Sequence, residues 1–299
     1  MKILKFLVLL IGSVFSAGAA IACELHEVPV GPMLGSLAAG IIIPYLIPST
    51  VDLTDNENWK SSQRKLKRAG LLQEDTIIRI SFAYLFRIKV DGKYFLVPNK
   101  RTKKFQPVGG AYKFTKDEAD YLSANIPVEN DDRIPINQIT KLDYRLLVKN
   151  KDLRKFVKRF DKTEYRENLA DLSREFSEEI FSTGILDKVK FGTLKYKYCG
   201  RHMTKVEYGR IFSHYELLLA DIVEVTLSDE QEQLFRNLMQ TECDNYHFAK
   251  ADEIESLGAN LGTDDLADVI ANHTPKILCE HADALTQRKK HKKVFVVQL

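Results

Sequence analysis

The sequence predicts an α/β fold that follows an N-terminal two-helix transmembrane hairpin. Two uncharged runs, 6–23 and 28–47, open the chain, and each is about as long as the ~20 apolar residues that a bilayer-spanning helix needs. In the rest of the chain, segments with strand-like alternation are interleaved with segments whose apolar residues have helical spacing. These observations indicate a mixed α/β domain behind a membrane segment.

The composition is that of a globular chain with no strong charge. Its 299 residues fit one large domain or two smaller ones, and 44% hydrophobic residues are enough for a sizeable core. The net charge of +3 does not indicate nucleic-acid binding, so direct DNA binding is not expected. The cysteines Cys23, Cys199, Cys243 and Cys279 are far apart, which is typical of a reduced compartment and gives no zinc motif.

Charges at the ends of the two apolar runs predict their orientation. Lys2 and Lys5 precede the first run, a basic cluster at 60–68 follows the second, and the link at 24–27 is acidic. By the positive-inside rule, both ends lie in the cytoplasm and the link lies outside. Small residues recur in both runs and favour close helix packing. A multi-pass membrane protein with a cytoplasmic domain follows.

A cleaved signal sequence is the alternative for the first run. Residues 1–22 have a basic start, an apolar centre and small residues near their end, and Cys23 gives a loose likeness to a lipoprotein cleavage site. A secreted domain or a lipoprotein would not meet cytoplasmic nucleotides. This alternative leaves the run at 28–47 unexplained, so we prefer the hairpin.

The chain divides into four predicted parts. These are a transmembrane hairpin at 1–49, a basic juxtamembrane linker at 50–75 with a helix at 59–69, the main domain at 76–280 and a basic tail at 281–299.

The main domain is expected to open with a β-hairpin. Strand-like runs at 76–90 and 93–97 flank Asp91-Gly92, a pair that favours a tight hairpin turn. A loop with a short helix is expected at 114–135, and Ser228 is a plausible helix cap. Further strands are expected at 142–148, 189–198 and 208–225, and helices at 151–165, 166–181, 228–239 and 264–271.

Two short motifs in the domain indicate chemistry. Gly109-Gly110 lets a ligand or another backbone approach a strand closely, although a turn or bulge explains the pair as well. On the helix at 166–181, Glu175, Glu178 and Glu179 share one face, where Mg²⁺ would relieve their repulsion and bridge to a phosphate. A solvated charged face is the alternative. Arg174 is placed to pair with one of these glutamates.

Together these motifs resemble a NUDIX domain, a mixed-sheet α/β/α sandwich. The resemblance rests on Gly109-Gly110 and on the segment Arg-Glu-Phe-Ser-Glu-Glu at 174–179. It implies that Glu175, Glu178 and Glu179 are metal ligands, with Mg²⁺ as the possible cofactor. The chain departs from the family box in three places: Phe160 stands for its leading glycine, Arg166 for its earlier glutamate, beside Glu164 and Glu167, and Phe181 for its last glycine.

The whole chain is similar to the SMODS-associated NUDIX proteins. The segments 80–87, 106–110 and 273–278 carry this likeness together with the apolar N-terminus. It implies a bacterial inner-membrane effector of cyclic-oligonucleotide antiphage signalling (CBASS). A partner nucleotidyltransferase would make the cyclic oligonucleotide, the NUDIX-like domain would bind it, and the hairpin, oligomerising on activation, would disrupt the membrane lipid. A membrane-anchored hydrolase of nucleoside diphosphate derivatives is the alternative.

A cyclic oligonucleotide needs cations for its phosphates and flat rings for its bases. Tyr198 is a candidate for stacking against a base, in addition to the residues named below. An ordinary structural role is the alternative for each of these residues. The candidate ligand-binding residues are Arg79, Arg87, Gly109, Gly110, Tyr112, Arg174, Arg201, His202, Arg210 and His214.

Overall fold

The fold is described from a computed structural model, and contacts divide the chain into two compact units, Met1–Ala69 and Gly70–Leu299. The described residues are 2–37, 40, 42–46, 58–131, 133, 135, 140–209, 212–241, 243–259, 269–278, 285 and 293–299.

The first unit contains one long apolar helix. Helix α1 (Lys2–Leu25) includes a stretch, Phe6–Leu25, with mean hydropathy 2.3, and its large apolar side chains are mostly exposed. By length and composition it fits a membrane anchor or a signal sequence. The helix expected at 59–69 is confirmed as α4 (Trp59–Arg68), which begins after Asn58, whose side chain accepts a hydrogen bond from the Ser61 N–H.

The expected second transmembrane helix is not found among the described residues. After α1 the chain turns back, so that Gly31 lies against the Ala20 carbonyl, but helix α2 (Gly31–Leu37) has only seven residues. Only α1 is long and apolar enough to cross a membrane in the described part of the chain, so the multi-pass prediction is not supported. Pro32 and Pro44, with glycines between them, are residues that disfavour a continuous helix.

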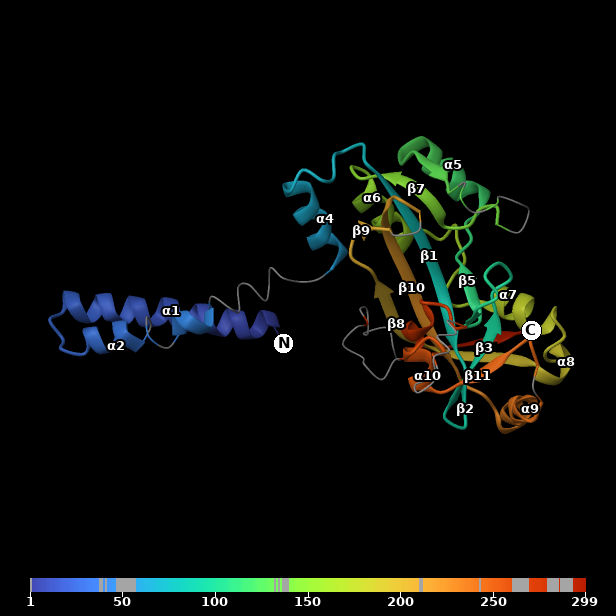
Figure 1. The fold of residues 1–299 in the computed structure, drawn as a ribbon. Helices are drawn as coiled ribbons and strands as arrows, with labels where there is room; N and C mark the ends of the chain where they lie inside the picture. The colour runs from blue at the N-terminus through green and yellow to red at the C-terminus, as the bar shows by residue number, and fades with distance from the viewer. Residues whose placement is uncertain are drawn as a thin grey trace. The chain divides into compact units, whose positions relative to one another are not determined.

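The second unit is built on a mixed eight-stranded sheet, which confirms the mixed α/β fold. Its order is β12-β8-β10-β1-β7-β6, with β5 on β1 and β9 on β10, and β1 and β10 are parallel (Figure 1). The strands are β1 (Ile77–Arg87), β5 (Gly109–Ala111), β6 (Val128–Asn130), β7 (Arg145–Lys149), β8 (Thr193–Met203), β9 (Glu207–Tyr208), β10 (Tyr215–Val225) and β12 (Val294–Gln298).

A smaller sheet has the order β11-β3-β2, with β4 on β3. Its strands are β2 (Lys89–Val90), β3 (Lys93–Pro98), β4 (Phe105–Gln106) and β11 (His247–Ala249). The predicted hairpin at Asp91-Gly92 is confirmed between β2 and β3, and both turn residues have positive φ, 47° and 79°. The long run expected at 76–90 is divided, because β1 joins the large sheet and β2 the small one.

Strand β1 separates two different environments. Its even-numbered side chains are buried aromatic and aliphatic groups; Phe82 packs edge-on against Phe160 of helix α6 (Leu153–Lys162). Its odd-numbered side chains, from Arg79 to Leu85, lie on the other face, where Leu85 joins a core with residues of the small sheet. The face without aromatic groups therefore has room for a cavity.

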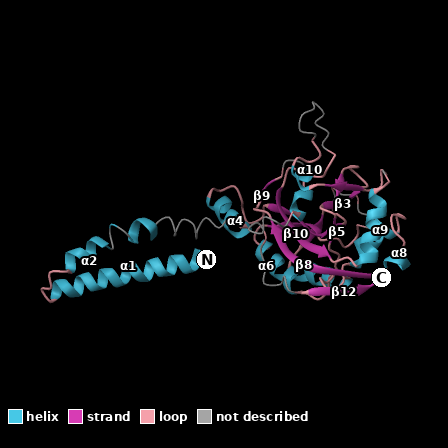
Figure 2. Cartoon of the chain, turned by 90° about the horizontal axis from the view of Figure 1, so that it is seen from below, coloured by secondary structure: helices cyan, strands magenta, loops and turns pink. Residues whose placement is uncertain are grey.

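The remaining elements follow the predictions in part. Helices α5 (Lys116–Asn125) and α9 (Asp229–Met239) form as expected, and Ser228 caps α9. The strand expected at 189–198 begins later, because helix α8 (Lys188–Phe191) precedes β8. A short helix, α10 (Ala251–Glu255), and the turn η3 (Thr274–Ile277) complete this unit. Figure 2 shows β8, β10 and β12 together, with α6 and α9 outside them.

Two predictions fall largely outside the described residues. Of the helix expected at 264–271 only 269–271 are described, and of the tail at 281–299 only 285 and 293–299. The end of the tail forms edge strand β12 on β8, which the sequence reasoning did not anticipate.

Candidate functional site

The glutamate segment, residues 173–181, is an α-helical turn followed by a π-helical turn. Helix α7 (Ser173–Phe176) passes into the π-helical turn η2 (Ser177–Phe181), so the helix predicted from residue 166 begins seven residues later. Phe176 and Ile180 are fully buried, as expected of its anchoring side. The opposite side carries Glu175, Glu178 and Glu179.

Arg174 ties this segment to its surroundings. Its guanidinium donates to Glu167 at 2.6 and 3.0 Å, to Glu175 Oε1 at 2.7 Å and to the Ala111 carbonyl on β5 at 2.9 Å. Glu167 also accepts a hydrogen bond from the Lys113 N–H, at 2.8 Å. Glu167, which is one residue beyond Arg166, therefore supplies a carboxylate that pairs with Arg174.

The glycine pair lies directly under the glutamates. The Gly109 N–H donates to Glu179 Oε2 at 2.8 Å, and Gly109 has φ 142°, with the Tyr84 carbonyl occupying the place of a side chain. At Gly110 a Cβ would collide with the Glu175 carboxylate. The close approach that the glycines predicted is therefore made by the chain's own groups.

In the described structure, the three glutamates lie against other groups of the domain. Glu175 is paired with Arg174, Glu179 accepts from Gly109, and Glu178 Oε1 lies 3.7 Å from the Arg174 guanidinium. Within the described residues, no three His, Cys, Asp or Glu side chains gather as metal ligands would. Burial raises the pKa of Glu175, although Arg174 opposes this. Binding of Mg²⁺ by these residues stays a prediction.

Glu179 gives a pH-dependent prediction. Burial raises its pKa from 4.5 to about 8, so the folded chain keeps this carboxyl protonated where the unfolded chain ionises it. Its contribution to stability is fully present below pH 4.5 and is lost as the pH rises through about 8. In melting experiments with a chelator, the melting temperature of Glu179→Gln is therefore expected to rise relative to that of the wild type between pH 5 and pH 9. A constant difference in melting temperature across that range would contradict this.

A cavity of about 260 Å³ lies on the non-aromatic face of β1. Its floor is formed by odd-numbered residues of β1 and by β5 and β10, and its walls by the turn at 99–106, the start of β7 and the segment 273–276. None of the described residues that line it is Asp or Glu. Its basic and imidazole side chains are Arg79, Arg101, Arg145, His273 and Lys276.

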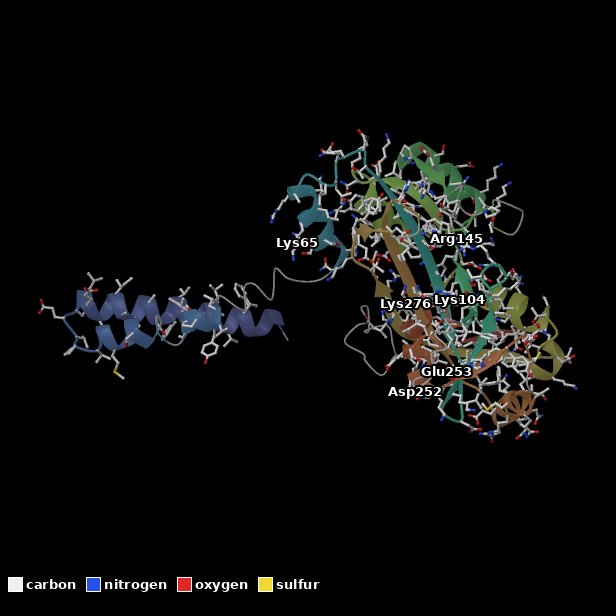
Figure 3. The ribbon with its side chains drawn as sticks, viewed as in Figure 1. Lys65, Lys104, Arg145, Asp252, Glu253 and Lys276 are labelled. Atoms are coloured by element: carbon white, nitrogen blue, oxygen red, sulfur yellow. The ribbon has the colours of Figure 1, made fainter. Side chains whose placement is uncertain are left out.

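These side chains differ in how far the chain already neutralises them. Arg79 pairs with buried Asp131 at 2.6 Å and with Glu216 at 3.0 Å, and Arg145 shares Asp143 with Lys113. Lys276, by contrast, forms no ion pair or hydrogen bond through its ammonium group in the described structure, and burial lowers its pKa. Burial also lowers the pKa of His273, to about 4, so this ring is neutral. Figure 3 shows Lys276 and Arg145 beside β1.

Three of the ten candidate residues, Arg79, Gly109 and Gly110, line this cavity. Three others are buried in core networks away from it. Arg87 pairs with Glu224 at 2.7 Å, while Arg201 and Tyr112 both contact Asp221.

The remaining candidates have different surroundings. Arg174 holds the glutamate segment, as described above. His202 contacts the backbone of Lys276, with its Nε2 at 3.0 Å from the Lys276 carbonyl oxygen. His214 contacts carbonyl oxygens of its own turn. Arg210 lies outside the described residues. Tyr198, the additional platform, donates to Asp221 at 2.9 Å.

Sequence reasoning missed four cavity residues, Arg101, Arg145, His273 and Lys276. The segment 273–278 had already been singled out for its family likeness, which was the available signal for His273 and Lys276.

A larger hollow of about 670 Å³ lies beside β12. Its lining mixes Asp161 and Glu167 with Arg166 and Lys293, and includes the rings of Tyr198 and Phe295. The carboxylates of this lining would repel a phosphate. The acid-free cavity on β1 is therefore the better candidate for an anionic ligand.

Comparison with known proteins gives one family. The model of the SMODS-associated NUDIX domain matches residues 77–278. No curated protein matches the chain. The matched segment runs from the start of β1 to the end of the segment that carries Lys276, so it contains both the glutamates and the cavity.

Proposed function

The chain belongs to the SMODS-associated NUDIX family, and on this premise we propose that it senses a cyclic oligonucleotide and acts on the bacterial inner membrane. Membership links the protein to nucleotide-signalling defence systems, in which the signal comes from a nucleotidyltransferase. In our proposal the domain binds that signal, the N-terminal segment self-associates in the lipid, and the membrane is disrupted.

The glutamate segment carries the preference for a sensor over a hydrolase. A hydrolase of this kind needs carboxylates that converge on metal ions. Here Glu175 and Glu179 are held by Arg174 and by the Gly109 N–H, and Glu175 fills the space above Gly110. This arrangement supports a structural role, in which the segment fixes β5 against β1.

Coupling to the membrane requires a ligand that binds one state of the chain better than the other. A shift from mostly inactive to mostly active protein needs a difference of about 5 kcal/mol between the two affinities. Hydrogen bonds between the phosphates and cationic groups are of a size to supply it, because each contributes about 1.5–3 kcal/mol. Helix α1 is the described element that would carry the signal into the bilayer.

The alternative is a membrane-anchored hydrolase of nucleoside diphosphate derivatives. The retained segment Arg174 to Glu179 favours it, and the substituted box positions Phe160, Arg166 and Phe181 do not.

Turnover by the full chain in detergent tests the two functions. With ADP-ribose and Mg²⁺ as the probe, we expect no turnover by the wild type above that of a double variant, Glu178→Gln with Glu179→Gln. Both proteins are expected to bind cyclic di-adenylate or cyclic tri-adenylate and to release it intact. Mg²⁺-dependent hydrolysis that the double variant loses would establish the hydrolase and contradict the sensor.

A further inference from the structure

We propose that the acid-free cavity on β1 binds one phosphate of a nucleotide, and that Lys276 is the residue that pairs with it. The inference rests on the proposed function, since it names the place where the nucleotide signal binds. Basic side chains from separate parts of the chain line this cavity.

The turn that carries Lys276 is packed against the large sheet. It lies on η3, which packs across β1 and β10, and Thr274 and Ile277 on the same turn are fully buried. The His202 ring lies 3.0 Å from the Lys276 carbonyl oxygen and so helps to fix the turn. Lys276 therefore lines the cavity from a turn that packing holds in place.

Among the described residues, Lys276 has no counter-charge. A half-buried ammonium with no ion pair or hydrogen bond in the described structure is costly, and its pKa is lowered accordingly. A phosphate oxygen beside Lys276 would remove that cost. Arg79 needs no such partner, because Asp131 and Glu216 already balance it, so it serves as part of a fixed wall.

The size of the cavity limits the group that it can hold. About 260 Å³ is enough for a phosphate with part of its nucleotide, but not for a whole cyclic oligonucleotide. Gly109, Gly110 and Ala111 bring the backbone of β5 to the floor, and Arg101 comes from the turn above. One unit of the ring would enter, and the others would stay at the mouth near Arg101.

Binding by the full chain in detergent tests this site, with inorganic pyrophosphate, cyclic di-adenylate and cyclic tri-adenylate as probes. Lys276→Met keeps most of the side-chain volume and removes the charge, and Lys276→Arg restores the charge. Lys188→Met, at an exposed lysine of α8 outside the cavity lining, is the matched control. We expect Lys276→Met to weaken binding about ten-fold or more, and the other two variants to stay close to the wild type.

Thermal melting separates a binding role from a structural one. Because the Lys276 ammonium group has no ion pair or hydrogen bond among the described residues, Lys276→Met is expected to melt at or above the temperature of the wild type. A lower melting temperature with unchanged binding would overturn the proposal. So would an absence of pyrophosphate and nucleotide binding by the wild type.

The failure of this inference is distinguishable from that of the proposed function. If Lys276→Met binds a cyclic nucleotide as well as the wild type does, the site lies elsewhere and the sensor stands. If the wild type binds pyrophosphate through Lys276 but binds neither cyclic nucleotide, the phosphate site stands and the sensor for these nucleotides fails.

Discussion

Replacing Asp221 by alanine is expected to lower the free energy of unfolding of the domain by about 3–5 kcal/mol. Asp221 is fully buried on β10, where its two oxygens accept four hydrogen bonds. They come from Tyr112 at 2.8 Å, from Tyr198 at 2.9 Å, and from Arg201 at 2.7 and 2.8 Å. The change would leave two buried hydroxyls without this acceptor, and it would take from the buried Arg201 guanidinium a carboxylate that Asp161, which also pairs with it, does not replace.

Such a loss is a large part of the ~5–15 kcal/mol that stabilises an ordinary protein. Chemical denaturation of the full chain in detergent, followed by circular dichroism, measures it. Asp75→Ala is the matched control, because Asp75 pairs with Lys149 and Lys151 at the surface and its side chain is 70% exposed. Its expected cost is much smaller, because water screens ion pairs between exposed side chains. A similar stability of the two variants would show that the Asp221 network does not hold the sheet together.

This network also explains why several ligand predictions fell on core residues. Arg201 and Asp221 are neighbours across β8 and β10, and Arg87 pairs with Glu224, which lies 137 residues further along the chain. A sequence pattern shows an arginine but not the carboxylate that a distant strand places beside it. Arginines that resembled phosphate ligands therefore proved to be internally neutralised.

Local signals were more reliable. Asp91-Gly92 predicted its turn and Ser228 its helix, because the positive φ values and the cap depend on neighbouring residues alone. The start of the glutamate helix was misplaced, since residues 166–172 are held by contacts to distant strands; the Leu172 N–H, for example, donates to the Tyr196 hydroxyl. Lys276 was missed for the same reason, because only packing across β1 and β10 brings η3 to the cavity.

The second large effect concerns the membrane. A lysine at Val14, near the middle of α1, is expected to abolish membrane damage while leaving nucleotide binding unchanged. Val14 is 66% exposed and lies within the stretch Phe6–Leu25, so its side chain would face lipid. A lysine at the centre of a membrane helix costs about 3 kcal/mol of insertion free energy, whereas Val14→Leu keeps the helix apolar.

A permeability assay in cells, with and without the partner nucleotidyltransferase, measures this effect. Cells with the wild type or Val14→Leu are expected to admit a membrane-impermeant dye only when the nucleotidyltransferase is active. The reason is that the chain shifts to its damaging state only when the ligand is bound. Cells with Val14→Lys are expected to exclude the dye in both conditions, while the purified variant still binds the cyclic nucleotide probes. Leakage by Val14→Lys would show that α1 does not act from within the bilayer. Equal leakage by the wild type with and without the nucleotidyltransferase would show that the nucleotide does not gate the membrane segment.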